Sequence, residues 1–140
     1  PNGNPREVIS RDNLHTVYLW GYGDRYPIAE IKNATLAQVE AAVSSIFGMT
    51  SSALAQNSLP DAAKLKALRK HTSLSKAQVT VFTHLPLIGV SSVTDPTGKT
   101  LYYEYDELGR LKRNYYYENN IMQESEKRVL QEYDYHYRNQ

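Results

Sequence analysis

Aromatic and β-branched residues alternate with polar residues in four stretches of the chain. These stretches cover residues 15–31, 78–93, 101–117 and 128–138. The alternation is most regular in the last stretch, where Tyr133, Tyr135 and Tyr137 are separated by single polar or charged residues. Successive side chains of a strand point to opposite faces of a sheet, so these three tyrosines share one face. The pattern predicts β-strands in all four stretches.

Turn-forming residues divide the first three stretches into pairs of strands. Segments 22–28, 84–90 and 105–111 are similar in kind: each joins an aromatic-rich arm to an apolar, alternating arm through a loop with Gly or Pro. Pro and Gly at the second and fourth positions of 95–98 predict a further turn. The pair at 119–120 is Asn-Asn, and Asn tolerates a positive φ. The sequence therefore predicts successive copies of one strand–turn–strand unit.

Residues 34–77 have a different composition, rich in Ala, Ser, Leu and Lys and without Tyr. Thr35 followed by Gln38 forms a capping-box pattern, and Gly48 stands where a helix C-cap belongs. Apolar residues recur between them at helical spacing: Leu36, Val39, Val43, Ile46 and Phe47. A short helical turn is expected within 49–58. We expect this apolar face to pack on the local sheet or, as the alternative, on a neighbouring domain or partner chain.

A second amphipathic helix is predicted from Pro60-Asp61 onward. Its inward side carries Ala62, Leu65 and Leu68. Its outward side carries the basic residues Lys64, Lys66, Arg69 and Lys70. No aromatic residues interleave with these cations for base stacking, so we interpret them as a solvated face rather than a nucleic-acid site.

Composition narrows the function classes. The chain has 140 residues, 41% of them hydrophobic, and includes 12 tyrosines, whose rings can pack while their hydroxyls stay in water. The net charge of +1, from 16 basic and 15 acidic residues, predicts no long-range attraction to nucleic acid. The absence of Cys excludes disulfides, zinc thiolate sites and a Cys nucleophile. No apolar run reaches the length of about 20 residues that a membrane-spanning helix needs.

Candidate catalytic residues are few. Asp134 with His136 could imitate a base and its orienting carboxylate, and Glu104 with Asp106 could imitate the paired carboxylates of a glycosidase. Polar side chains two positions apart on a strand share a face, and such pairs are more often exposed to solvent than catalytic. No Gly-x-Ser-x-Gly elbow, phosphate-binding glycine loop or metal-spaced His pair occurs. We expect no enzymatic activity, no cofactor and no metal site.

The segment "YYEYDELGRLKR" resembles the signature of the YD repeats, the tandem units of bacterial Rhs proteins. Tyr105-Asp106 fills the Tyr-Asp pair, and Gly109, Arg110 and Leu111 fill the Gly-Arg-Leu positions. The copy at 15–31 departs from this pattern with Gly-Asp-Arg-Tyr-Pro in its turn, and the copy at 78–93 lacks Tyr-Asp. The resemblance does not extend to the helical insert.

The resemblance implies a long, spiralling antiparallel sheet, as in Rhs shells and exported adhesive proteins. The expected fold is α+β: a twisted antiparallel β-sheet of YD-type hairpins with a two- to three-helix insertion packed on one face or end. The chain is treated as a single module over 1–140. Its parts are a partial repeat with the first hairpin (1–33), the helical insert (34–77) and the YD-type hairpins (78–140).

The chain starts Pro-Asn-Gly-Asn-Pro without an initiator Met, so we interpret it as part of a longer polypeptide. The preferred hypothesis is a non-enzymatic capping module at the C-terminal end of an exported or surface bacterial YD-repeat protein. Its first partner would be the upstream YD-repeat domain of the same polypeptide. It would support adhesion, surface display or delivery of a partner.

Two alternative functions stay open. One is a carbohydrate- or protein-binding module that uses exposed aromatic rings, and the candidate binding residues are Trp20, Tyr22, Tyr116, Tyr133, Tyr135 and Tyr137. The other is a toxin or enzyme fragment. Structural tiling predicts that Tyr103, Tyr105, Tyr133 and Tyr135 are largely buried against cross-strand neighbours. Ligand binding predicts several rings exposed together in one groove.

Overall fold

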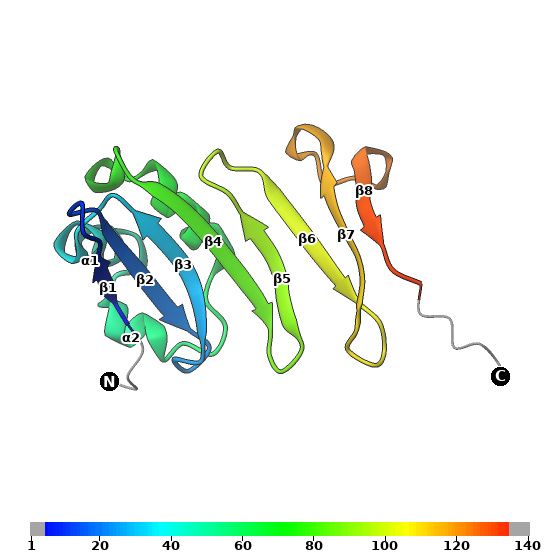
Figure 1. The fold of residues 1–140 in the computed structure, drawn as a ribbon, viewed down its shortest axis with the longest axis horizontal. Coiled ribbons are helices and arrows are strands. Elements are labelled where there is room, and N and C mark those ends of the chain that lie inside the picture. Colours follow the sequence, from blue (N-terminus) through cyan, green and yellow to red (C-terminus); the bar gives the residue numbers. More distant parts are fainter. Residues whose placement is uncertain (1–4, 135–140) are drawn as a thin grey trace.

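One antiparallel sheet runs through the whole described part of the chain. The computed structural model describes residues 5–134, and these residues contribute eight strands in the order β1 to β8 (Figure 1). The strands are β1 (Glu7–Ile9), β2 (His15–Gly21), β3 (Tyr26–Lys32), β4 (Gln78–Leu85), β5 (Gly89–Thr94), β6 (Thr100–Tyr105), β7 (Leu111–Tyr117) and β8 (Lys127–Glu132). Strands that follow one another in the sequence pair antiparallel throughout, with β1 and β8 at the two edges, which confirms the predicted antiparallel sheet and the α+β class.

The three predicted hairpins lie side by side in this sheet. They are β2–β3, β4–β5 and β6–β7, and each contains a bulge close to its turn. The irregularities fall after Leu19, Thr83 and Glu104. A bulge increases the local twist of a strand pair and changes which face the following side chains use. The fourth predicted strand is present as β8, and its expected continuation beyond residue 134 lies outside the described residues.

Three helices connect β3 to β4: α1 (Leu36–Phe47), α2 (Ser51–Ala55) and α3 (Ala62–Ala67). Short 3-10 turns over Leu68–Lys70 and Thr72–Leu74 follow α3. The predicted ends of α1 are confirmed, because Thr35 and Gln38 exchange both capping-box hydrogen bonds and Gly48 closes the helix with φ of 71°. Asp61 caps α3 by accepting hydrogen bonds from two backbone N–H groups. None of the helices in the described part is long and apolar enough to cross a membrane.

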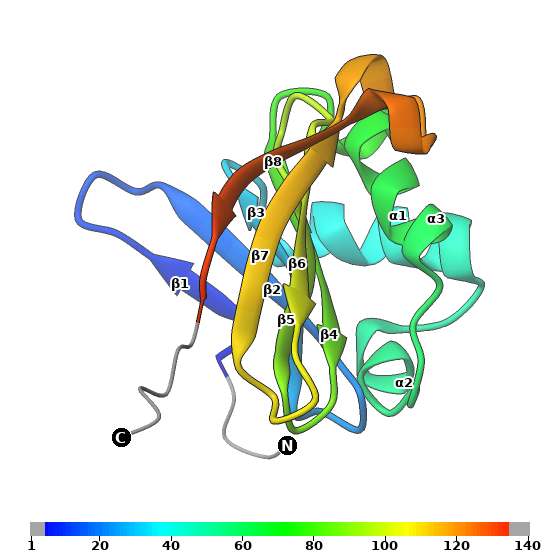
Figure 2. The same cartoon turned by 90° about the vertical axis from the view of Figure 1, so that its right-hand side faces the viewer.

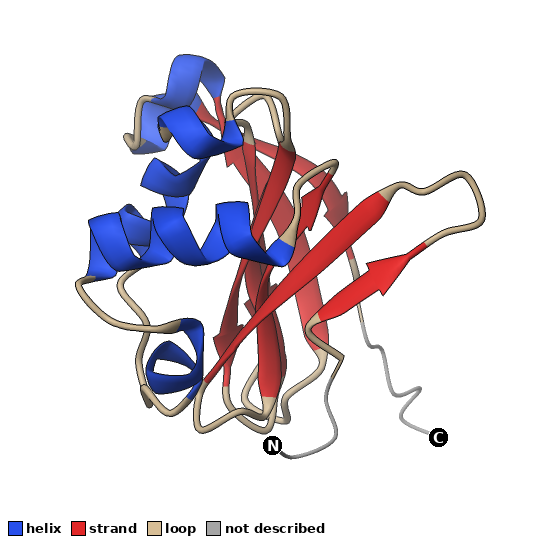
Figure 3. Ribbon diagram, turned by 90° about the vertical axis from the view of Figure 1, so that its left-hand side faces the viewer, coloured by secondary structure: helices blue, strands red, loops and turns tan. Residues whose placement is uncertain are grey.

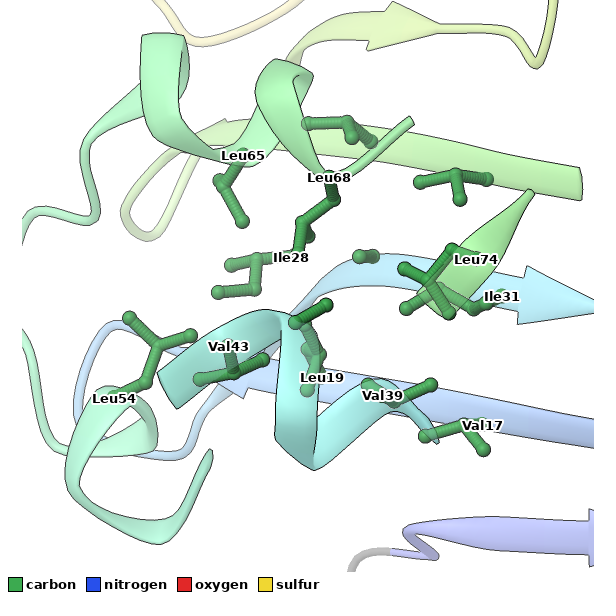
Figure 4. Close-up of a cluster of buried hydrophobic side chains, with 14 of the residues drawn as sticks. Val17, Leu19, Ile28, Ile31, Val39, Val43, Leu54, Leu65, Leu68 and Leu74 are labelled. Carbon is green, nitrogen blue, oxygen red and sulfur yellow. The ribbon is translucent and has the colours of Figure 1, made fainter. Parts of the chain in front are cut away.

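The helices form a layer on one face of the sheet, over its N-terminal half (Figures 2 and 3). Side chains from the two layers meet in a fully buried core (Figure 4). Its largest members are Val17, Leu19, Ile28, Ile31, Val39, Val43, Leu54, Leu65, Leu68, Leu74 and Val79. All of these belong to β2, β3, β4 or the helical insert, so the apolar face of the insert packs on the local sheet as expected.

Strands β5 to β8 extend beyond the helix layer. Every residue of β6 is only half-buried, and five of the six residues of β8 are exposed. This open part of the sheet includes the predicted YD-type segment 101–117, which carries six of the chain's 12 tyrosines. Both the tiling and the binding hypotheses therefore concern this part of the sheet.

Candidate functional site

The turns after β5 and β6 share one hydrogen-bonding pattern. In the Asp106–Arg110 turn, the Asp106 N–H donates to the Arg110 carbonyl and the Gly109 N–H donates to the Asp106 carbonyl. The Asp106 carboxylate also accepts bonds from the N–H groups of Leu108 and Arg110, both at 2.9 Å. The Asp95–Lys99 turn repeats these bonds with Asp95, Thr97, Gly98 and Lys99 in the matching places.

The acidic residue of each turn is held as a carboxylate. The backbone N–H of Arg110 is the main cause of the lowered pKa of Asp106, and the Arg110 Nε at 2.8 Å adds to it. For Asp95, the hydroxyl of Thr97 is the main cause of the lowered pKa. Hydrogen bonds to the ionised form favour that form. Asp106 is therefore a turn-forming acceptor, and its lowered pKa is opposite to what a glycosidase acid needs.

A third turn of this kind connects β1 to β2, and sequence reasoning missed it. The Ser10 N–H donates to the Leu14 carbonyl, and the Asn13 N–H donates to the Ser10 carbonyl. The Ser10 hydroxyl accepts from the Leu14 N–H, as the Asp carboxylates do in the other two turns. Asn13 takes the glycine position with φ of 65°, against 78° for Gly109. Only the spacing Ser-x-x-Asn could have revealed this turn.

Tyrosine hydroxyls join neighbouring hairpins near their turns. The Tyr105 hydroxyl donates to the Val90 carbonyl at 2.8 Å, so β6 is fixed to β5 by a side chain as well as by the ladder. Gly89 makes this approach possible, because a Cβ there would lie 2.5 Å from the Tyr105 hydroxyl oxygen. On the other side of β4, the hydroxyls of Tyr22 and Tyr26 accept from the N–H groups of His84 and Leu87.

The YD-type positions therefore have structural contacts. Tyr105 contacts the preceding hairpin, Asp106 and Gly109 form the turn, Arg110 pairs with Asp106, and Leu111 begins β7 opposite Tyr105. These residues come together at one end of the β6–β7 hairpin. Their side chains stabilise the hairpin and its neighbour, and their arrangement leaves no free acid–base pair at the turn.

The candidate binding residues are not brought together. Trp20 lies on the face opposite the helices, in a shallow hollow with Tyr18 and Phe82, and its indole N–H donates to the Pro5 carbonyl at 2.8 Å. The expectation of an exposed ring is wrong for Tyr22, which is 7% exposed because its ring packs edge-on against Tyr26 and His84. Tyr22 is the first residue of the β2–β3 turn and has a positive φ of 56°.

The other candidates lie far from Trp20 along the sheet. Tyr116 in β7 lines a separate groove on the same face with Val93, Leu101, Tyr103 and Leu130. Tyr133 is 40% exposed and donates its hydroxyl to Gln131, so the tiling expectation of a buried ring is wrong at this position. It follows the edge strand β8, where no further strand covers it among the described residues. Tyr135 and Tyr137, and with them His136, lie outside the described residues.

The catalytic candidate Glu104 is engaged in ion pairs. Glu104 accepts from Arg113 at 3.1 Å through both oxygens and lies 3.8 Å from Lys112. Arg113 also binds Glu132 at 3.1 Å, so charges link β6, β7 and β8 across the sheet. Within residues 5–134, no three His, Asp or Glu side chains lie close enough together to hold a metal ion.

A tyrosine cluster on the helix side of the open sheet was not predicted as a unit. Tyr102 stacks on Tyr115 with ring centroids 5.4 Å apart, and Tyr117 meets both rings edge-on. The ammonium of Lys127 lies 4.3 Å from the centre of the Tyr115 ring. The cluster adjoins Lys66 of α3, since both line one hollow. Cross-strand pairing of Tyr102 with Tyr115 could have been found only with the strand register.

No family model matches this chain, and searches of curated proteins and of solved structures found no match either.

Proposed function

We propose that this chain is a non-enzymatic structural module of a bacterial YD-repeat protein, placed at the C-terminal end of its sheet. The observation that carries the proposal is the recurrence of one Asp-x-x-Gly turn together with tyrosine hydroxyls that bridge adjacent hairpins. Side chains that stabilise a sheet across strands are what a repeat protein needs, because each repeat contacts only its neighbours. On this view, the partner of the module is the upstream repeat domain of the same polypeptide.

The β1 edge is the place where upstream hairpins would join. The side chains of Val8 and Ile9 are 47% and 54% exposed, although both are large and apolar. The strand is also fixed to the helix layer, because Glu7 accepts hydrogen bonds from the Leu36 N–H and from His15. A free strand edge with apolar side chains is a template for another strand. The helix layer would then close one face of the sheet at this end and support surface display, adhesion or delivery of a partner.

Hydrogen exchange tests this proposal directly. We would compare this chain with the same chain joined to the hairpins that precede it in its natural reading frame. Added strand pairing at the β1 edge predicts strong new protection of amides over residues 7–9, and little change in β4, which is already paired on both sides. Unchanged exchange over residues 7–9 would contradict a role as the end of a longer sheet.

The hollow around Trp20 favours one alternative, a carbohydrate- or protein-binding module. Tyr18, Trp20 and Phe82 place three aromatic rings around it on the face that the helices leave uncovered. Amphipathic rings of this kind are typical of interaction surfaces. Binding that is lost on Trp20→Ala and kept on Tyr133→Ala would support this second function.

A further inference from the structure

A notch lies where the helix layer ends and the open sheet begins. Its wall is formed by Lys66 in α3 and by Arg69 and Lys70 in the following 3-10 turn. Its floor is formed by Thr100, Tyr102 and Tyr117 of β6 and β7. The two parts are continuous, since the hollows that contain them share Lys66 and Gly98. We call these six side chains the basic notch; Figure 2 shows the helices standing on this side of the sheet.

The charges of the basic notch are unbalanced. None of the residues that line the two hollows is Asp or Glu, although the chain as a whole is nearly neutral. Lys66, Arg69 and Lys70 have no ion pair with any other described residue, whereas Glu104, Arg113 and Arg128 each take part in two. Three cations without counter-charges in one concave site attract an anionic ligand.

The guanidinium of Arg69 lies against the β5–β6 turn. Gly98 has φ of 94°, and a Cβ at this glycine would lie 2.5 Å from Nη2 of Arg69. The guanidinium therefore rests against the turn where no side chain stands in its way. This contact restricts the Arg69 side chain on one side, so the side chain loses less conformational freedom on binding than one surrounded by solvent.

The floor offers hydroxyl groups on a rigid base. Tyr102 and Tyr117 pack against each other and against Tyr115, which limits the motion of their rings. Burial raises the pKa of the Tyr102 hydroxyl, so this group stays neutral in ordinary buffers. It donates a long hydrogen bond of 4.0 Å to the Met122 sulfur, a weak acceptor that a ligand oxygen would replace. A ligand in the notch thus meets cations on one side and fixed donors and ring edges on the other.

We propose that the basic notch binds an extended acidic peptide segment of a partner protein. Lys66 and Lys70 are separated by four positions, which corresponds to about 6 to 8 Å along α-helical and 3-10 backbone. Alternate side chains of an extended peptide share one face and lie about 6.6 Å apart. Acidic residues at alternate positions would therefore face the two lysines, and the side chains of the same peptide could reach the tyrosine floor.

The binding test uses the full chain and a labelled peptide in which aspartate and tyrosine alternate, followed by fluorescence anisotropy. Lys66→Gln, Arg69→Gln and Lys70→Gln should each weaken binding about two- to five-fold, the range for partly exposed ion pairs. Added NaCl should weaken it further, because salt screens exposed charges. The matched control is Lys64→Gln, which removes a cation of the same helix that does not line the notch.

Several outcomes would overturn the proposal. A loss for Lys64→Gln equal to that for Lys66→Gln would show general attraction to a basic surface. Equal or tighter binding of a sulfated oligosaccharide or single-stranded DNA of the same charge would assign the notch to another polymer. Unchanged affinity for a peptide in which asparagine replaces aspartate would show that the three cations do not contribute to binding. Circular dichroism of each variant checks that the fold is kept. Hydrogen exchange at β1 tests the proposed function separately from this binding experiment.

Discussion

Individual tyrosine hydroxyls connect hairpins that are adjacent in the sheet. Tyr22 and Tyr26 reach the β4–β5 hairpin, and Tyr105 reaches β5 from the following hairpin. In each bond the partner is a backbone group near a turn. These tyrosines therefore fix the relative position of neighbouring hairpins, in addition to the ladder bonds between strands.

Replacing the Tyr105 hydroxyl should destabilise the protein by about 0.5–1.5 kcal/mol, the usual net contribution of one hydrogen bond. Tyr105→Phe removes the donor to the Val90 carbonyl and keeps the ring. The control is Tyr103→Phe, because the Tyr103 hydroxyl has no hydrogen bond within the described residues; its effect should stay within about 0.5 kcal/mol. Urea unfolding measures both. Equal losses for the two variants would show that the bond to Val90 contributes nothing specific.

The alternating sequence pattern predicted the strands that carry these tyrosines, but not their individual contacts. The tiling expectation treated Tyr103 and Tyr105 alike, as rings buried against cross-strand neighbours. A bulge between Glu104 and Tyr105 breaks the alternation, and Tyr105 alone reaches the preceding hairpin. Bulges depend on the pairing of two strands, so a single strand's sequence does not reveal them.

At the scale of elements, the five-residue turn recurs in three of the strand connections. Asp95, Asp106 and Ser10 supply the side-chain acceptor, and Gly98, Gly109 and Asn13 supply the left-handed residue. This is the combination expected for a short hairpin loop with a residue in the left-handed region before the second strand. The Asp-x-x-Gly copies were visible in the sequence, whereas Ser10 with Asn13 performs the same task with different residue types.

The left-handed position of the turn predicts an order of stability. Gly109→Ala should cost about 1–2 kcal/mol, because a Cβ is disfavoured at φ of 78°. Gly109→Asn should cost clearly less, since Asn13 already occupies the equivalent position of the β1–β2 turn. No neighbouring atom lies within 4 Å of a Cβ at this site, so crowding does not confuse the comparison. Thermal or urea unfolding that ranks alanine equal to asparagine would contradict the equivalence of the turns.

The ends of the helix α1 were the most predictable feature of the fold, because they depend on interactions between residues close in sequence. A capping box and a C-terminal glycine need only residues close in sequence, so Thr35, Gln38 and Gly48 predicted α1 correctly. The basic notch could not be predicted in this way. Lys66 and Tyr102 belong to segments that are separate in the sequence, and only the packing of the insert on the sheet brings them together.

At the scale of the whole molecule, the core is concentrated at one end of the sheet. The fully buried side chains come from β2, β3, β4 and the helical insert, while β6 and β8 hold none. The same alternating pattern occurs in both halves of the sequence, so the pattern alone could not tell which half the helices cover. Burial of apolar area is the main source of stability, and the two ends of the sheet should therefore differ in stability.

Hydrogen exchange should show this difference within one chain. Amides of β2, β3 and β4 should exchange only through global unfolding, whereas those of β7 and β8 should exchange faster through local opening.

Leu68→Ala, at a fully buried side chain, should destabilise the protein by about 2–5 kcal/mol. It should accelerate exchange in β2 to β4 and have a smaller effect in β8, where local opening dominates. Leu130→Ala, at a side chain that is 59% exposed, serves as the control and should leave β2 to β4 unchanged. Uniform protection from β2 to β8, with every strand responding equally to Leu68→Ala, would mean that the open strands fold as one cooperative unit with the core despite their missing helix cover.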